Sequence, residues 1–551
     1  MTDRLILLCA LAALLTGAQP ALATGPFIPV NELKPGLKGY GLSVFKGTEP
    51  ERFEAEVIAV LARNLPSQDM VLVRLSGCGL ERSGIIAGMS GSPVYFDGRL
   101  AGAVAYGWAF SKDPIAGVTP IASMLEELHR PAAPVPESTG LRRLAAPLMV
   151  SGFSPAIVER LRKRLGPLGF APFAGAAASG ASTASTPEPV PGGALGVQMV
   201  RGDWDASAVG TITYVEKDRL VGFGHPLYQL GAMDIPATGA RVHTIFASTD
   251  FSFKFASPLG PLGSLVEDRQ SGVVVARGRQ ARMVPVHLRV RNTASGRKQD
   301  FHLEVLDNPV LTSSLIVEAA ASAIEAAEAA CSDVTADVRL KARFDGGREL
   351  TLADRFHSAR RSPIDIAPLL ECLAIPANSF GPSRLTSMEL ELEVEPGRRT
   401  AELLAAYPSA REVRPGGQVV LNVALKPYGK PVTSVRVPIR VPLQTGAGRL
   451  QLEVLPGSVL EPDLARPEDL DGLLRFVQAR YRSTELVVSF QAPGESLKRR
   501  GFQVDHAPLS LQAVLGPGPE PSSARQRLGT DWVLTGSASC SVDVRPVAVE
   551  K

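Results

Sequence analysis

The segment Gly88-Met89-Ser90-Gly91-Ser92-Pro93, followed by Val-Tyr-Phe-Asp-Gly-Arg-Leu-Ala-Gly-Ala-Val-Ala-Tyr-Gly over residues 94–107, indicates the fold. Small residues surround Ser90, and an Asp-Gly turn then joins two apolar stretches into a predicted hairpin. Gly88 and Gly91 let the chain bend sharply and leave no bulky side chain beside the hydroxyl. A nucleophilic serine needs an exposed hydroxyl, a base and backbone N–H groups that face the oxyanion. The segment predicts such a loop; a plain Gly/Ser-rich connection is the alternative.

The length and composition indicate a globular protein with several apolar cores. The chain has 551 residues, of which 45% are hydrophobic and 21% charged, and this length predicts three or four domains. The formal net charge is only +3, and no basic run of the kind that binds nucleic acid appears. We therefore expect no nucleic-acid partner.

The N-terminus has the pattern of a secretory leader. Arg4 supplies a positive charge, residues 5–15 form a short apolar run, and Ala21-Leu22-Ala23 is a small-x-small cleavage site. The run is too short to span a bilayer comfortably, and no later segment is apolar enough to do so. We expect cleavage after Ala23, no stable membrane span, and a secreted or periplasmic mature protein.

Four cysteines follow the predicted leader, and three disulfide pairings are open to them. Their wide spacing fits no metal motif, so we expect no metal and no cofactor. Cys78 lies near the serine turn, and we expect it to be buried or paired. The four residues are Cys78, Cys331, Cys372 and Cys540.

The pattern along the chain predicts a mainly β protein with two β-rich halves separated by a linker rich in Ala, Gly, Ser, Thr and Pro. A helical segment follows, and then alternating apolar and polar residues favour an immunoglobulin-like β-sandwich with a small α/β tail. In order, we expect a signal peptide (1–23), a serine-bearing β-barrel half (25–172), a flexible linker (173–196), a histidine-bearing half (197–310), a helical connector (311–383), a β-sandwich (384–450) and a C-terminal α/β region (451–551).

A serine nucleophile requires a base, and His225 has the most suggestive setting of the seven histidines. It stands in Gly222-Phe223-Gly224-His225-Pro226, where small neighbours would leave the imidazole accessible. An ordinary loop histidine is the alternative. His243 alternates with apolar residues, as a histidine on a sheet surface would.

Residues 84–93, with the hairpin and residues 113–118, resemble the serine segment of the SpoIVB-type serine peptidases. Residues 210–226 are similar to the histidine segment of that family. The resemblance implies a trypsin-like peptidase fold of two β-barrel halves that makes limited cuts in secreted proteins. Ser90 would be the nucleophile and His225 the base, while the backbone N–H groups of Gly88 and Ser90 would form the oxyanion hole.

The chain departs from the family pattern in two respects. Ser90 precedes His225, whereas the family has the reverse order; a permuted arrangement of two half-sites accommodates this, because a catalytic constellation is defined in space. The acidic residue expected upstream of the serine also has no counterpart. Asp234 follows His225 most closely and is the candidate orienting acid, with a Ser–His dyad as the alternative. Other aspartates that could serve are Asp69, Asp113 and Asp250.

The resemblance also implies how a peptide would bind. Ala105, Tyr106 and Gly107 would pair with the substrate backbone as an added strand. Gly84, six positions before the serine, would favour a small or apolar residue at the cleavage site. The competing interpretation is a non-catalytic envelope protein that keeps the peptidase-like fold as a scaffold and binds a cell-envelope partner through its C-terminal β region.

Overall fold

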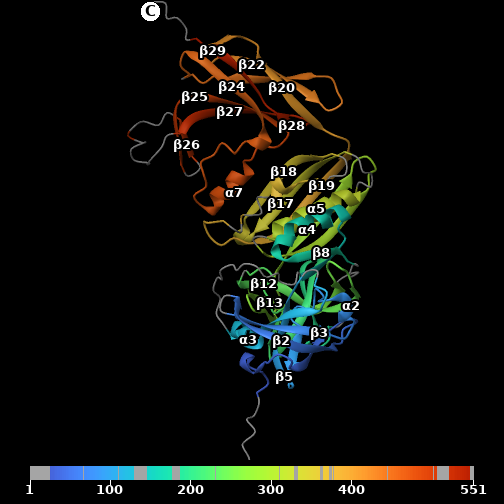
Figure 1. Ribbon diagram of the computed structural model, residues 1–551. Helices are drawn as coiled ribbons and strands as arrows, with labels where there is room; N and C mark the ends of the chain where they lie inside the picture. Colours follow the sequence, from blue (N-terminus) through green and yellow to red (C-terminus); the bar gives the residue numbers. More distant parts are fainter. Residues whose placement is uncertain are drawn as a thin grey trace, which may run out of the picture.

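The computed structural model stacks three β-rich layers, with blue and green strands at one end and the orange and red C-terminal strands at the other (Figure 1). The structure describes residues 25–65, 68–108, 111–129, 146–175, 186–229, 231–308, 311–327, 333–359, 364–370, 375, 378–443, 445–499, 502–505, 510 and 520–545. The predicted leader, Cys331 and Cys372 lie outside these ranges. Across the ranges, no helix is both long and apolar enough to cross a membrane.

The first barrel contains the serine segment. Its six strands close in the order β1-β2-β3-β6-β5-β4, all antiparallel, around Phe53, Val73 and Phe96. The hairpin predicted after the serine loop is β4–β5, with Val94 paired to Gly102. The strands are β1 (Lys38–Ser43), β2 (Glu51–Leu65), β3 (Gln68–Ser76), β4 (Pro93–Phe96), β5 (Arg99–Gly107) and β6 (Ile115–Pro120), with the short helices η1 (Val30–Glu32) and α2 (Leu80–Ser83) beside them.

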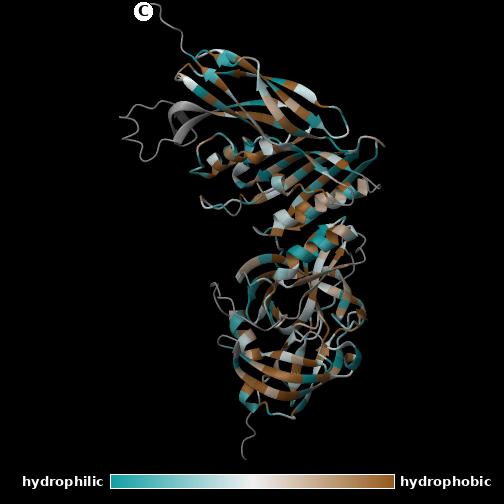
Figure 2. Ribbon diagram, turned by 45° about the horizontal axis from the view of Figure 1, so that its top comes forward, coloured by the Kyte–Doolittle hydropathy of each residue, from teal (hydrophilic) through white to brown (hydrophobic). Residues whose placement is uncertain are grey.

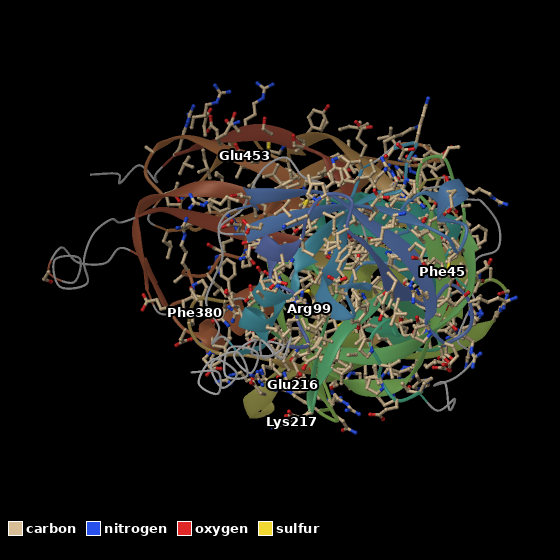
Figure 3. The ribbon with its side chains drawn as sticks, turned by 60° about the horizontal axis from the view of Figure 1, so that its bottom comes forward. Phe45, Arg99, Glu216, Lys217, Phe380 and Glu453 are labelled. Atoms are coloured by element: carbon tan, nitrogen blue, oxygen red, sulfur yellow. The ribbon has the colours of Figure 1, made fainter. Side chains whose placement is uncertain are left out.

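A second six-stranded barrel contains the histidine segment. Its pairings run β9-β12-β13-β14-β11-β10 and return to β9, so the ring is closed. The strands are β9 (Ala194–Gly202), β10 (Asp205–Glu216), β11 (Arg219–Gly222), β12 (Gly231–Phe246), β13 (Phe253–Arg269) and β14 (Gly272–Arg277). Helix α3 (Ile121–His129) joins the barrels, because Ile121 and Met124 pack with Leu100 of the first and Val221 of the second. Glu216 and Lys217 mark the β10–β11 turn at the rim of the molecule (Figure 3).

Strands β9 and β10 run beyond the second barrel into a larger sheet. There β10 pairs with β7 and β9 pairs with β16, and the sheet continues through β15 and β19 to β17 and β18. Helices α4 and α5 pack against this sheet and share one hydrophobic core with it (Figure 1). The added elements are β7 (Ala146–Ser151), α4 (Pro155–Leu165), η2 (Gly166–Leu168), β8 (Phe170–Ala174), β15 (Met283–Asn292), β16 (Lys298–Leu306), α5 (Leu311–Ala327), β17 (Val334–Phe344), η3 (Asp345–Gly347), β18 (Glu349–Ser358), α6 (Ala367–Leu370) and β19 (Leu385–Pro396).

This sheet differs from the expected helical connector over residues 311–383. Among the residues of this range that the structure describes, α5 is the one long helix. Strands β17 and β18 form a hairpin with alternating burial, because their apolar residues recur at every second position. The next strand, β19, pairs in parallel with β15, so it belongs to this sheet and not to the sandwich predicted from residue 384. A non-local parallel pairing of this kind leaves no local sequence signal.

The C-terminal layer is formed by two sheets that share one core, which includes Leu421, Val423, Leu452 and Val488. Hydrophobic and hydrophilic residues alternate along its strands (Figure 2). No boundary separates residues 384–450 from 451–551 here, since strands from both ranges bury their apolar faces together. The strands are β20 (Thr400–Pro408), β21 (Glu412–Val413), β22 (Gln418–Pro427), β23 (Thr433–Arg440), β24 (Gly448–Pro456), β25 (Glu485–Arg499), β26 (Phe502–Asp505), β27 (Glu520–Gly529), β28 (Val533–Gly536) and β29 (Ala538–Val544), with η5 (Gly457–Val459) after β24.

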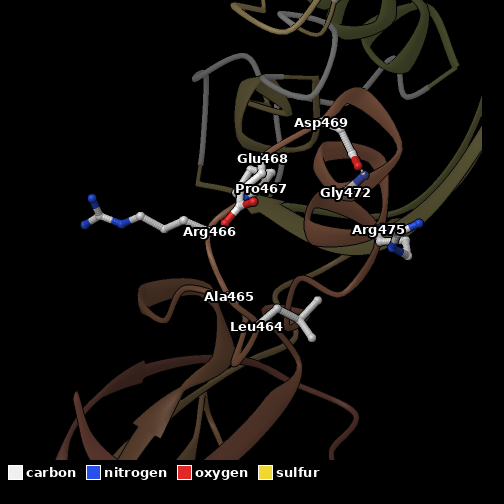
Figure 4. Close-up of a pocket in the computed structure, with 8 residues that line it drawn as sticks. All are labelled: Leu464, Ala465, Arg466, Pro467, Glu468, Asp469, Gly472 and Arg475. Atoms are coloured by element: carbon white, nitrogen blue, oxygen red, sulfur yellow. Dashed lines mark hydrogen bonds between the residues drawn. The ribbon is translucent and has the colours of Figure 1, made fainter. Parts of the chain in front are cut away.

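Helix α7 (Leu470–Gln478) lies between the sandwich and the large sheet and begins beside a surface pocket (Figure 4). The carboxylate of Asp469 points to Gly472 and caps the helix, accepting its N–H at 2.5 Å. Arg466 extends away from the pocket. The residues that line the pocket include no serine, threonine or cysteine, so it presents no nucleophile.

Candidate active site

The Ser90 loop lies between the two barrels and is held by both. The carbonyl oxygen of Ser90 accepts the N–H of Thr211 from β10 at 2.8 Å, and the Gly91 N–H donates to Val104 of β5 at 2.7 Å. Gly91 has a φ of +96°, and a Cβ atom there would lie 2.0 Å from the Thr211 carbonyl oxygen. Glycine is therefore required at this position, because it permits both the left-handed backbone and the close approach of β10.

His225 follows a tight turn at the end of β11. Phe223 has a φ of +64°, and the N–H of Gly224 donates to Gly222 at 2.8 Å, which closes a three-residue turn with a strained centre. The Thr119 hydroxyl of the first barrel donates to the Gly224 carbonyl at 2.6 Å. A contact from the opposite barrel thus fixes the backbone immediately before His225.

The structure brings the two predicted residues together: Ser90 Oγ lies 2.9 Å from His225 Nε2. On the other side of the ring, Nδ1 lies 2.8 Å from the Pro226 carbonyl oxygen. A carbonyl oxygen only accepts hydrogen bonds, so Nδ1 carries a proton and donates. In the neutral imidazole Nε2 then accepts the proton of Ser90, which is the arrangement that a general base needs.

The serine is enclosed, whereas the sequence predicted an exposed hydroxyl. Ser90 and His225 are each only 1% exposed. The small residues around Ser90 let β10 and the Phe223 turn pack directly against the loop, as the short approach at Gly91 shows. The same glycines that were expected to open the site instead allow the second barrel to close over it.

Two backbone donors beside Ser90 are free. Within the described part of the chain, the N–H groups of Gly88 and Ser90 take part in no hydrogen bond. The carbonyls of the same peptide groups are held, since Ala87 O accepts the Lys254 N–H at 3.0 Å and Met89 O accepts the Ser92 N–H at 2.8 Å. A planar trans peptide directs its N–H away from its carbonyl, so both contacts orient the N–H groups predicted to form the oxyanion hole.

The candidate acid Asp234 has other partners. Its carboxylate accepts the Ser264 hydroxyl at 2.6 Å and the Arg282 N–H at 3.2 Å, and it forms an ion pair with Arg279. Asp69 similarly accepts a backbone N–H, from Arg63 at 2.9 Å. The structure therefore gives neither carboxylate the orienting role beside His225, because each is committed to its own strand or turn.

Asp268 of β13 is a site residue that sequence reasoning missed. Its buried carboxylate accepts the N–H groups of Leu227, Tyr228 and Gln229 at 2.7, 2.6 and 2.8 Å. These three residues follow His225-Pro226 directly, so one side chain holds the segment that leaves the histidine. No motif marked this aspartate, since it lies 43 positions beyond His225 on another strand.

Lys254 is the second missed residue. It lies in β13, fully buried behind the serine loop, and burial lowers the pKa of its amine to about 7. Its Nζ donates to Ser43 Oγ at 2.9 Å and to Thr211 Oγ1 at 3.2 Å. A lysine between two phenylalanines in an apolar strand carried no distinguishing sequence signal.

The residues expected to bind substrate lie on β5 and at the C-terminal end of α2. Tyr106 pairs with Gly117 of β6, and its ring centroid lies 6.4 Å from that of His225. Ala105 and Tyr106 are buried, as Ser90 is. Gly84 has a φ of +66°, and a Cβ there would meet nothing within 4 Å. The backbone conformation at this position therefore favours glycine, and no neighbouring atom lies close enough to Gly84 to form the wall of a substrate pocket.

Cys78 differs from its expected state, because it is an exposed free thiol. It lies at a turn with a φ of +51°, and its Sγ donates to the Arg52 carbonyl at 3.3 Å. The Gly77-Cys78-Gly79 turn directs the side chain out of the barrel. Cys540, on β29 of the sandwich, is also free.

A comparison with protein-family models finds one match over residues 30–125, to the family described as SpoIVB peptidase S55. Over this segment the chain is similar to the SpoIVB-type serine peptidases. The SpoIVB-type segment contains Ser90, both candidate oxyanion donors and the whole of β1 to β6, whereas His225 and the second barrel lie outside it. Searches of curated proteins and of solved structures found no match.

Proposed function

We propose that this protein is a serine endopeptidase that makes limited cuts in secreted or envelope proteins through Ser90 and His225. The observation that carries the proposal is the 2.9 Å contact between Ser90 Oγ and His225 Nε2 across the two barrels. The SpoIVB-type match over the serine barrel supports the same reaction class. A scaffold would need neither this contact nor the free N–H groups beside it.

The reaction follows from the groups in place. His225 Nε2 takes the proton of Ser90 Oγ as the oxygen attacks the scissile carbonyl, and the oxyanion formed is bound by the N–H groups of Gly88 and Ser90. Collapse of the tetrahedral adduct breaks the C–N bond, and the imidazolium gives its proton to the leaving amine. Water, activated by the same histidine, then hydrolyses the acyl-enzyme. The Pro226 carbonyl keeps Nδ1 as the donor throughout.

The enclosed site bears on specificity. Ser90 and His225 are each 1% exposed. A peptide therefore reaches them only after the segments of this protein that cover them move aside. A substrate that adds as a strand beside residues 105–107 would supply the binding energy for this opening. This requirement favours few, selected cleavages over general proteolysis.

The proposal is tested by comparing the exported proteins of a strain that makes the wild type with those of a strain that makes Ser90→Ala. New N-termini should appear only with the wild type, while circular dichroism shows equal folding of both purified proteins. If the two sets of N-termini are identical, the enzyme assignment fails. Sequencing of the exported protein itself should give Thr24 as its first residue, which tests the proposed leader.

A binding scaffold is the second candidate. The enclosure of the dyad favours it, since a buried serine without an opening motion cleaves nothing. The C-terminal sandwich would then carry the interaction with an envelope partner. Wild type and Ser90→Ala would capture that partner equally and leave it uncut.

A further inference from the structure

Lys254 occupies an unusual position for a lysine. Its side chain is fully buried, and among the described residues no carboxylate lies within ion-pair distance of its amine. The partners of Nζ are the neutral hydroxyls of Ser43 on β1 and Thr211 on β10. Burying an amine among neutral groups costs free energy that an apolar side chain would not cost. A buried lysine of this kind therefore calls for an explanation beyond packing.

Both hydroxyls that bind the amine lead to the serine loop. Thr211 Oγ1 donates to the Gly88 carbonyl at 2.8 Å, and Ser92 Oγ donates to Ser43 Oγ at 2.9 Å. A hydroxyl has a single hydrogen. Because Lys254 Nζ donates into Thr211 Oγ1, the threonine hydrogen remains directed at Gly88. The amine thus sets the direction of the chain of hydrogen bonds that ends on the loop.

The backbone and stem of the same lysine contact Gly88 from the other side. The Lys254 N–H donates to the Ala87 carbonyl at 3.0 Å. A Cβ on Gly88 would lie 3.0 Å from Lys254 Cδ, so the stem packs against the glycine backbone. The carbonyls of Ala87 and Gly88 flank the Gly88 Cα, and both are held through Lys254. Fixing both peptide planes fixes the direction of the Gly88 N–H.

We propose that Lys254 is a positioning residue that holds both peptide planes at Gly88, one through its own backbone N–H and the other through Thr211, and that it thereby aims the Gly88 N–H at the oxyanion. This inference rests on the proposed function of Ser90 and His225 and adds a residue from the second barrel to the oxyanion hole of the first. The lysine touches neither substrate nor the reacting atoms. Its effect is on the rate at which the tetrahedral adduct forms and not on peptide binding.

The test compares Lys254→Met, which keeps the length of the stem, with Thr211→Val and Thr211→Ser. Thr335→Val is the matched control, because Thr335 Oγ1 also donates to a glycine carbonyl, that of Gly397 at 2.9 Å, in another layer. The readout is labelling of Ser90 by a fluorophosphonate, measured against probe concentration. This measurement separates the maximum labelling rate from the concentration that gives half of that rate.

Lys254→Met and Thr211→Val should each lower the maximum labelling rate about ten- to a hundredfold, which is a smaller effect than the loss of an oxyanion donor itself. The probe concentration that gives half of the maximum rate should stay within about twofold of wild type. Thr211→Ser and Thr335→Val should keep the rate. The Lys254→Met, Thr211→Val double variant should be no slower than either single one, because both act through one chain. An unchanged rate in Lys254→Met, or an equal loss in Thr211→Ser, would overturn the proposal.

A second measurement separates this proposal from the proposed function. Amide hydrogen exchange of residues 84–92, followed by mass spectrometry, reports the order of the serine loop without any activity. Lys254→Met and Thr211→Val should exchange faster there, and Thr335→Val should match wild type. A wild type that is never labelled contradicts the enzyme assignment alone, whereas unchanged exchange in both variants contradicts the role of Lys254.

Discussion

Ser90 Oγ and His225 Nε2 lie 2.9 Å apart although 135 positions separate the two residues and each belongs to a different barrel. The contact depends on the docking of the barrels, which is maintained by α3 and by backbone bonds such as Thr211 N–H to Ser90 O. Neither barrel alone contains both groups. The reverse order of serine and histidine along the chain is therefore compatible with one composite site.

Replacing His225 by glutamine should abolish the reactivity of Ser90. Without the imidazole no group takes the hydroxyl proton, so labelling of Ser90 by a fluorophosphonate should fall about a thousandfold or more. His243→Gln is the matched control, because His243 Nε2 lies at the same 2.9 Å from a serine hydroxyl, that of Ser257, on the surface. Equal labelling rates for the two variants would remove His225 from the mechanism.

Asp268→Asn should loosen the segment that follows His225. The amide keeps the size of the side chain but has one accepting oxygen where the carboxylate has two, and three N–H groups depend on them. We expect a loss of about 1–3 kcal/mol in the free energy of unfolding and slower labelling of Ser90. Chemical denaturation and labelling of the same preparations check both effects. A variant with wild-type stability would show that the three contacts contribute nothing.

Gly91→Ala should destabilise the protein much more than Gly98→Ala. Both glycines have positive φ, +96° and +74°, so both variants incur about 1–2 kcal/mol of backbone strain. Only at Gly91 would the new Cβ collide, 2.0 Å from the Thr211 carbonyl oxygen, while the surroundings of Gly98 are open. Scanning calorimetry should show a small decrease in Tm for Gly98→Ala and a large one for Gly91→Ala. Equal decreases would contradict the close docking of β10 on the serine loop.

The stability difference between Lys254→Met and wild type should depend on pH. Burial lowers the lysine pKa from 10.5 to about 7, so between these values the unfolded chain binds a proton that the folded protein lacks. Wild-type stability therefore gains a contribution that rises with pH across this window, and the cost of the lysine is fully present below about pH 7. The advantage of Lys254→Met should shrink from pH 7 toward pH 10.5. Urea unfolding of both proteins across that window measures it, and a constant difference would show an ordinary lysine pKa.

Much of the serine half could be predicted from the sequence because its signals are local. The glycines around Ser90 and the Asp97-Gly98 turn specify a loop and a hairpin, and both are found there. Ser90 and His225 could also be predicted as the candidate nucleophile and base, since glycines stand close to each of them in the sequence. Their supporting residues could not. Lys254 acts through contacts that form only after β13 docks on the first barrel. Asp268 acts through contacts between β13 and the segment that joins β11 to β12.

The later part of the chain was harder to predict for a topological reason. Alternating apolar residues identified β19 and β22 as strands, but alternation does not say which sheet a strand joins. β19 pairs in parallel with β15, about a hundred positions earlier, and β24 to β29 complete the sandwich with β20 to β23. Both arrangements depend on which apolar faces meet, which is information that no single segment carries.

A fluorophosphonate adduct on the intact purified protein, located by peptide mapping, would show whether Ser90 is a nucleophile activated by His225. We expect one phosphonylated residue, Ser90, and no adduct in Ser90→Ala or His225→Gln. An intact wild type that remains unlabelled, or an adduct of equal yield in His225→Gln, would contradict it.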